Sequence, residues 1–217
     1  MTPEQIIQKT IAYVKTEFER DSSGHDWWHI YRVWKNALAI CQHEPADVFT
    51  VELAALLHDL DDLKLRPSPP TPLPPVEERD ETPVRAAAWL RQMEVDPAVS
   101  AHVCEIITHL SFKGAGVANK ISSLEGMIVQ DADRLDAIGA VGIARAFAYG
   151  GHAGRPLYDP DEPPQMHQSF AQYKSSRSAT INHFYEKLLL LKERMNTKTA
   201  KLIAEQRHAY METFLDQ

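Results

Sequence analysis

The chain has 217 residues, of which 44% are apolar and 24% charged, and its formal net charge is −7. This length suits one domain with a substantial core, and the acidic balance without a basic tract argues against a nucleic-acid partner. No apolar run approaches the ~20 residues of a membrane span, and the first residues lack the layout of a signal peptide. Together with two widely separated cysteines, Cys41 and Cys104, these features predict a cytoplasmic protein that contacts no membrane.

Helix signals begin at the N-terminus and strand signals are almost absent, so we predict an all-α fold. Thr2 followed by Pro3 predicts the start of a first helix with a cap and a proline in its first turn. A second helix is predicted to begin near DSSGHD and to run through WWHIYRVWKNALAIC, and a third to cover about residues 46–60. The tryptophans of the second helix are expected to pack in the core: Trp27, Trp28 and Trp34.

The second half of the chain shows the same kinds of signal. Thr82 and Asp96 each precede a proline and predict helix starts, and Ser122 with Glu125 predicts a capping box for the next helix. Two long helices are expected to close the chain, in SATINHFYEKLLLLKERM and TKTAKLIAEQRHAYMETFL. Both look amphipathic, and they either complete the core or support a homodimer.

One segment cannot be helical. RPSPPTPLPP, residues 66–75, has six prolines in ten residues, which excludes a helix interior or a central strand. We predict an extended surface loop, and a ligand for an SH3-type domain is the alternative.

Residues 54–62, AALLHDLDD, end an apolar helix with a histidine and several aspartates. Further donors lie on other predicted helices, and one regular helix cannot aim both Asp131 and Asp133 at one ion, because they are ~200° apart. Two imidazoles with two carboxylates suit an octahedral divalent ion better than a closed structural zinc site. The candidate donors are His29, His58, Asp59, Asp131, Asp133 and Asp136.

This order of histidine, His-Asp pair and aspartate on successive helices resembles the HD-domain metal-dependent phosphohydrolase superfamily. The matching stretches are HIYRV (29–33), ALLHD (55–59) and ADRL (132–135). The surrounding sequence is similar to a bacterial branch that includes a Bacillus-type nucleoside triphosphate pyrophosphohydrolase. The resemblance implies a single-domain helical bundle, with an HD core at about 22–145 and C-terminal helices at about 165–217 packed on it.

The resemblance also implies which residues hold the ion and act on water. It implies one divalent ion bound by four ligands. Manganese is the preferred ion, and magnesium, iron, nickel and cobalt are the alternatives. These ligands are His29, His58, Asp59 and Asp133. Asp62 stands where related families place an acidic residue that orients or deprotonates the attacking water.

Other side chains are predicted to contact the substrate or to support the site. Arg32 lies one turn after His29, and Asp136 lies three residues after Asp133 on the same helix face. The predicted substrate-binding residues are Arg32, Lys113, His109 and Asp136, and His25 is predicted to support the site from behind. Arg134 and Arg145 rank behind them as candidates for binding phosphate.

These assignments predict a hydrolase that cleaves phosphate or pyrophosphate bonds of a small-molecule nucleotide, with pyrophosphate release from nucleoside triphosphates as the leading interpretation. The alternatives are a nucleoside monophosphatase or another phosphomonoesterase, an alarmone hydrolase, and a non-catalytic metal-dependent nucleotide sensor.

Overall fold

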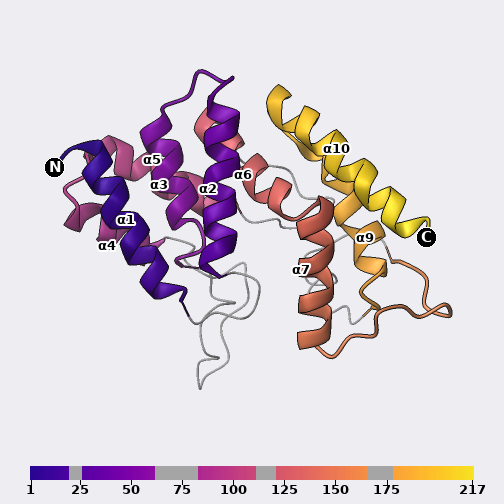
Figure 1. Ribbon diagram of the computed structural model, residues 1–217. Coiled ribbons are helices and arrows are strands. Elements are labelled where there is room, and N and C mark those ends of the chain that lie inside the picture. The colour runs from indigo at the N-terminus through magenta and orange to yellow at the C-terminus, as the bar shows by residue number, and fades with distance from the viewer. Residues whose placement is uncertain (20–25, 62–82, 111–120, 166–177) are drawn as a thin grey trace.

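In a computed structural model, residues 1–19, 26–61, 83–110, 121–165 and 178–217 are described, and every regular element among them is a helix (Figure 1). The prediction of an all-α fold is therefore confirmed. The α-helices are α1 (Pro3–Glu17), α2 (Trp27–Cys41), α3 (Val48–Leu57), α4 (Val84–Gln92), α5 (Pro97–Leu110), α6 (Leu124–Asp136), α7 (Gly139–His152), α9 (Asn182–Glu186) and α10 (Lys198–Leu215), and the short 3₁₀ helices are η3 (Leu188–Leu190) and η4 (Lys192–Arg194).

Helix α3 is the centre of the core. Residues 53–57 are completely buried, as expected for a helix that is apolar on every side. It packs against α1, α2, α5 and α6. Because neighbours surround it, α3 holds the polar residues that follow Leu57 in a fixed place.

Helices α2 and α6 connect the two sides of the molecule. Helix α2 packs on α3 and α6, while α6 runs behind it toward α7, and α10 packs against α6 and α7 (Figure 1). Helices α1, α3, α4 and α5 lie on the side of the N-terminus, and α7, α9 and α10 lie on the other. The interpretation of the chain as one domain stays a prediction.

Capping residues fix where several helices begin. Thr2 forms a capping box with Gln5 at α1, and Asp96 accepts hydrogen bonds from the first turn of α5. The predicted capping box at α6 is wrong, because Ser123 caps this helix through the backbone N–H of Gly126. Glu125 instead accepts a hydrogen bond from the backbone N–H of Asp47, so it joins α6 to the start of α3.

Two further sequence predictions need correction. Trp27 and Trp34 are buried as expected, but 58% of Trp28 is exposed. The first of the two long closing helices is broken into α9, η3 and η4. In a 3₁₀ turn, residues three apart lie on one side, and Leu188 and Leu191 are both buried.

Asp131 joins α6 to the start of α10. Its carboxylate is fully buried and accepts hydrogen bonds from the backbone N–H groups of Asn196 and Thr197, at 2.8 and 2.7 Å, and from the Thr197 hydroxyl at 2.9 Å. Burial raises the pKa of Asp131, and these hydrogen bonds offset part of the rise. Asp131 is thus a structural residue.

We expect Asp131→Asn to lower the free energy of unfolding by roughly 2–3 kcal/mol, because the new amide nitrogen would face N–H donors. For a chain of this size, that loss corresponds to a melting temperature about 5–10 °C lower. Thermal unfolding followed by circular dichroism measures the change, and an unaltered melting temperature would contradict the structural role.

No helix in the described ranges is long and apolar enough to cross a membrane. The predicted proline-rich loop at 66–75 lies outside the residues that the structure describes.

Candidate metal centre

Two helices bring two imidazoles and a carboxylate to one point. His29 lies in the first turn of α2, while His58 and Asp59 follow the last residue of α3. His29 Nε2 is 3.3 Å from His58 Nε2 and 3.3 Å from Asp59 Oδ2, and His58 Nε2 is 3.4 Å from Asp59 Oδ1. One ligand atom from each residue lies within 4.8 Å of the other two. Among the described residues, this is the group that can hold a metal ion.

Hydrogen bonds on the far side of each ring fix the direction of both imidazoles. His29 Nδ1 donates to Asp136 Oδ2 at 2.7 Å, and His58 Nδ1 donates to the backbone oxygen of Ala55 at 2.8 Å. With the proton on Nδ1, the lone pair of a neutral ring is on Nε2, which faces the partner histidine and Asp59. This is the usual arrangement of histidine ligands, so the donor set fits a divalent cation.

The capping residue of α2 also takes part in the orientation. The Asp26 carboxylate accepts a hydrogen bond from the backbone N–H of His29 at 2.9 Å. His29 is therefore held at the backbone by the helix cap and at Nδ1 by Asp136. The spacing of an aspartate three residues before the histidine is a cap signal that sequence reasoning did not use.

The charge around His29 shows how strongly this site favours a cation. Burial by itself lowers the pKa of His29, but hydrogen bonds to Asp136 and Asp59 and the negative charge of Asp59 raise it to about 9. A metal ion held at Nε2 would be stabilised by the same carboxylates.

Asp133 and Asp136 occupy different positions relative to this group. Asp133 Oδ1 is 3.6 Å from His29 Nε2, and 39% of its side chain is exposed, so it borders the group from its open side. Only 2% of Asp136 is exposed. Although burial alone raises the pKa of Asp136, its hydrogen bonds with His29 and Arg32 lower it below the ordinary value. The structure thus places Asp136 behind His29.

The model of the HD domain family matches residues 27–138, which include His29, the His58–Asp59 pair and Asp133. The chain belongs to the HD-domain family. Its solved relatives include HD-superfamily hydrolases, and the protein is a metal-dependent hydrolase of this superfamily.

Similarity extends over nearly the whole chain. YpgQ of Bacillus subtilis is 41% identical over 207 residues, which cover 95% of this chain and 88% of YpgQ. An HD-superfamily hydrolase from Bacillus thuringiensis is 44% identical, with a TM-score of 0.74 and coverage of 100% of this chain and 96% of that one. The structure of YpgQ in complex with ADP superimposes with a TM-score of 0.71 at 37% identity, covering 97% of this chain and 94% of that one.

The other residues predicted for the HD site lie as follows. Arg32 is about one-third exposed, and its Nε donates to Asp136 Oδ1 at 2.6 Å. His109 lies in the last turn of α5 with a partly exposed ring, and its contact with a substrate stays a prediction. The remaining predicted site residues lie outside the described residues: His25, Asp62 and Lys113.

The two arginines ranked behind Arg32 have different surroundings. Arg134 donates a hydrogen bond to the backbone oxygen of Arg194, which connects α6 to the segment before α10. Arg145 Nη1 donates to Asp136 Oδ2 at 2.6 Å and therefore lies beside the HD site. The sequence did not separate these two arginines, because their difference depends on how α7 packs.

Asp61, which had no predicted role, caps α4. Its carboxylate accepts hydrogen bonds from the backbone N–H groups of Arg85 at 3.1 Å and Ala86 at 3.0 Å. Two of the acidic residues after α3 therefore have different roles: Asp59 faces the histidines, whereas Asp61 connects the end of α3 to α4.

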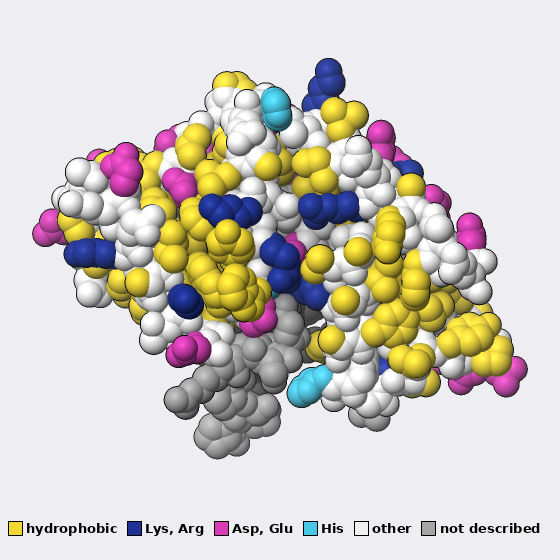
Figure 2. Space-filling view, in the orientation of Figure 1, with side chains coloured by type: hydrophobic (Ala, Val, Ile, Leu, Met, Phe, Trp, Pro, Cys, Tyr) yellow, Lys and Arg dark blue, Asp and Glu magenta, His cyan; other side chains and the backbone are white. Residues whose placement is uncertain are grey.

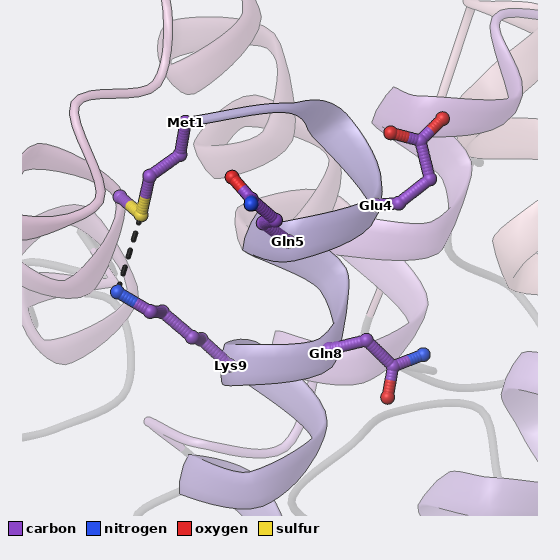
Figure 3. Close-up of a pocket in the computed structure, with 5 residues that line it drawn as sticks. All are labelled: Met1, Glu4, Gln5, Gln8 and Lys9. Carbon is purple, nitrogen blue, oxygen red and sulfur yellow. Dashed lines mark hydrogen bonds between the residues drawn. The ribbon is translucent and has the colours of Figure 1, made fainter.

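A hollow of about 400 Å³ at the start of α1 is unrelated to the HD site. Its lining residues come from one helical segment, and the Lys9 ammonium donates to the Met1 sulfur at 3.2 Å (Figure 3). The side chains of Glu4 and Gln8 point away from those of Met1 and Lys9. No group of metal-binding residues was found there among the described residues.

Proposed function

We propose that this HD-domain protein hydrolyses phosphate or pyrophosphate bonds of nucleotides with one divalent metal ion, and that nucleoside triphosphates are its substrates. The observation that carries the proposal is the group formed by His29, His58 and Asp59, next to arginines held by Asp136. Two imidazole nitrogens and a carboxylate suit a divalent ion, and guanidinium groups suit phosphate oxygens.

Support for a nucleotide comes from a relative. YpgQ of Bacillus subtilis has been solved in complex with ADP, and its fold matches this chain over almost its full length. A nucleoside triphosphate shares the adenosine and diphosphate groups of ADP when its base is adenine. This likeness supports nucleotides as the substrate class.

We propose His29, His58, Asp59 and Asp133 as the metal ligands and manganese as the preferred ion. A divalent ion bound there polarises a phosphoryl oxygen and lowers the pKa of a bound water. Arg32, which is partly exposed at 33%, binds phosphate oxygens, and Asp136 keeps His29 Nε2 directed at the group. Asp62 stays our proposal for the residue that orients the attacking water.

The proposal is tested by a substrate screen with the purified full-length protein. Nucleoside mono-, di- and triphosphates, in ribo and deoxy forms, are supplied with Mn²⁺, Mg²⁺, Fe²⁺, Ni²⁺ or Co²⁺, and phosphate and pyrophosphate are measured separately. We expect triphosphates to yield a monophosphate and pyrophosphate, most rapidly with Mn²⁺, and excess chelator to stop the reaction.

Two results would contradict this proposal in different ways. Turnover of monophosphates alone, with phosphate as product, would identify a monophosphatase. Tight binding of nucleotides and metal without turnover under any of these conditions would identify a sensor.

A further inference from the structure

One buried carboxylate holds two arginines from different helices. Asp136 Oδ1 accepts from Arg32 Nε of α2 at 2.6 Å, and Asp136 Oδ2 accepts from Arg145 Nη1 of α7 at 2.6 Å. Asp136 is 2% exposed, whereas the side chains of Arg32 and Arg145 are 33% and 21% exposed. The carboxylate therefore lies inside, and both arginine side chains are partly exposed.

The charges show why the second arginine matters. A divalent ion with the carboxylates of Asp59, Asp133 and Asp136 has a formal charge of about −1 at neutral pH, which repels a phosphate. Arg32 brings this sum to about zero, and Arg145 adds a further positive charge. Arg32 contacts Asp136 through two nitrogens, and Arg145 places a second guanidinium group at the same carboxylate.

Packing fixes the position of the helix that carries Arg145. Gly139, the first residue of α7, has a φ of +75°, and a Cβ at this position would lie 3.0 Å from Arg207 Cβ. Arg207 in turn donates to the backbone oxygen of Leu135 at 2.5 Å and to the Asn36 side chain at 3.1 Å. The α6–α7 turn is thus held against α10 and α2, which sets where Arg145 lies.

Arg145 also lies beyond the part of the chain that matches the HD domain model, residues 27–138. Lys and Arg side chains gather in the hollow between the half of the molecule with α2 and the half with α7 and α10 (Figure 2). Arg32 belongs to α2 and Arg145 to α7, and both contact Asp136, which also bonds His29. The planar guanidinium, with five N–H donors, suits bidentate contact with phosphate.

We infer that Arg145, together with Arg32, binds a phosphate group next to the one that is attacked, so that the site prefers nucleoside di- and triphosphates to monophosphates. This inference rests on the proposed function. A monophosphate has no second phosphate group for Arg145, whereas a longer polyphosphate chain reaches from the metal group toward α7.

The test uses the full-length protein loaded with Mn²⁺ and the variants Arg145→Gln and Arg145→Lys. The matched control is Arg91→Gln, which changes an exposed arginine on α4. Steady-state kinetics give KM and kcat for ATP, ADP and AMP, and calorimetry gives the affinities for Mn²⁺ and for inorganic tripolyphosphate. Circular dichroism compares the folding of the variants.

We expect Arg145→Gln to raise KM for ATP and ADP and to weaken tripolyphosphate binding by roughly tenfold or more. The KM for AMP and the affinity for Mn²⁺ should change less than twofold, roughly within the effect of a distant surface substitution. The effect of Arg145→Lys should lie between those of the wild type and Arg145→Gln, because lysine keeps the positive charge but lacks the planar guanidinium group. If Arg145→Gln does not fold, Arg145→Lys alone must show the same selective loss.

Other outcomes separate the inference from the proposed function. If Arg145→Gln impaired the hydrolysis of ATP and AMP equally, or weakened Mn²⁺ binding, Arg145 would act through Asp136 and His29. Either result would overturn the inference. Wild-type nucleotide kinetics in Arg145→Gln would overturn it while leaving the proposed function intact. If the wild-type protein hydrolyses no nucleotide but Arg145→Gln weakens tripolyphosphate binding, the proposed function fails and the assignment of Arg145 stands.

Discussion

An Asp59→Ala protein is expected to lose its divalent ion and, with it, at least roughly a thousandfold in hydrolytic activity. The Asp59 carboxylate lies 3.3 Å from His29 Nε2 and 3.4 Å from His58 Nε2. It therefore supplies the negative charge among the three residues that can hold the ion. A metal ion contributes several kcal/mol of transition-state stabilisation, and each 1.36 kcal/mol changes the rate about tenfold. Metal content by mass spectrometry and hydrolysis under metal-saturating conditions measure the two losses, and His58→Ala should behave in the same way.

The control for this experiment lies two residues away. Asp61→Ala removes another carboxylate after α3, but this one caps α4 through Arg85 and Ala86. We expect Asp61→Ala to lower stability by about 1 kcal/mol, as for the loss of a helix cap, and to keep its metal. Full activity of Asp59→Ala in the presence of a chelator would end the assignment of a metal-dependent hydrolase.

An Asp136→Asn protein is expected to bind its metal about 10–100-fold more weakly, although Asp136 is not a predicted ligand. Its Oδ2 accepts the hydrogen bond from His29 Nδ1, and a residue that orients a histidine ligand typically contributes this much to metal affinity. The substitution also removes the charge that holds Arg32 and Arg145. Titration with Mn²⁺, followed by calorimetry, measures the affinity.

Asp131→Asn is the matched control, since it changes another buried aspartate of the same helix. Asp131 binds the turn before α10 through Asn196 and Thr197. This variant should therefore lose stability and keep its Mn²⁺ affinity, while Asp136→Asn should lose affinity. Equal Mn²⁺ affinities in the two variants would show that the hydrogen bond to His29 does not support the metal centre.

Most of the helical architecture follows from local signals in the sequence. Pro3 after Thr2 and Asp96 before Pro97 start helices where expected, because capping depends on residues within one turn. The broken helices between residues 182 and 194 were missed, because the burial of Leu188 and Leu191 depends on neighbours distant in sequence. Trp28 was placed in the core for a similar reason, since periodicity does not show which face of α2 has a partner.

The site was predictable to the extent that it follows helix geometry. Asp131 and Asp133 are two residues apart, and the structure directs Asp131 to the turn before α10 while Asp133 borders the histidines. The sharing of Asp136 among His29, Arg32 and Arg145 was not predictable, because it joins three helices, and His29 and Arg32 lie 107 and 104 positions from Asp136. Sequence spacing contains no information on such contacts.

The complete burial of residues 53–57 in α3 has a consequence for how the protein can respond to a ligand. A helix that is enclosed by α1, α2, α5 and α6 cannot shift or fray without opening the core around it. The backbone that carries His58 and Asp59 therefore persists until the whole fold unfolds, and local fluctuations do not release it. Adjustment to ligands of different length is then expected at α7, whose Arg145 contacts Asp136, rather than in the backbone of His58 and Asp59.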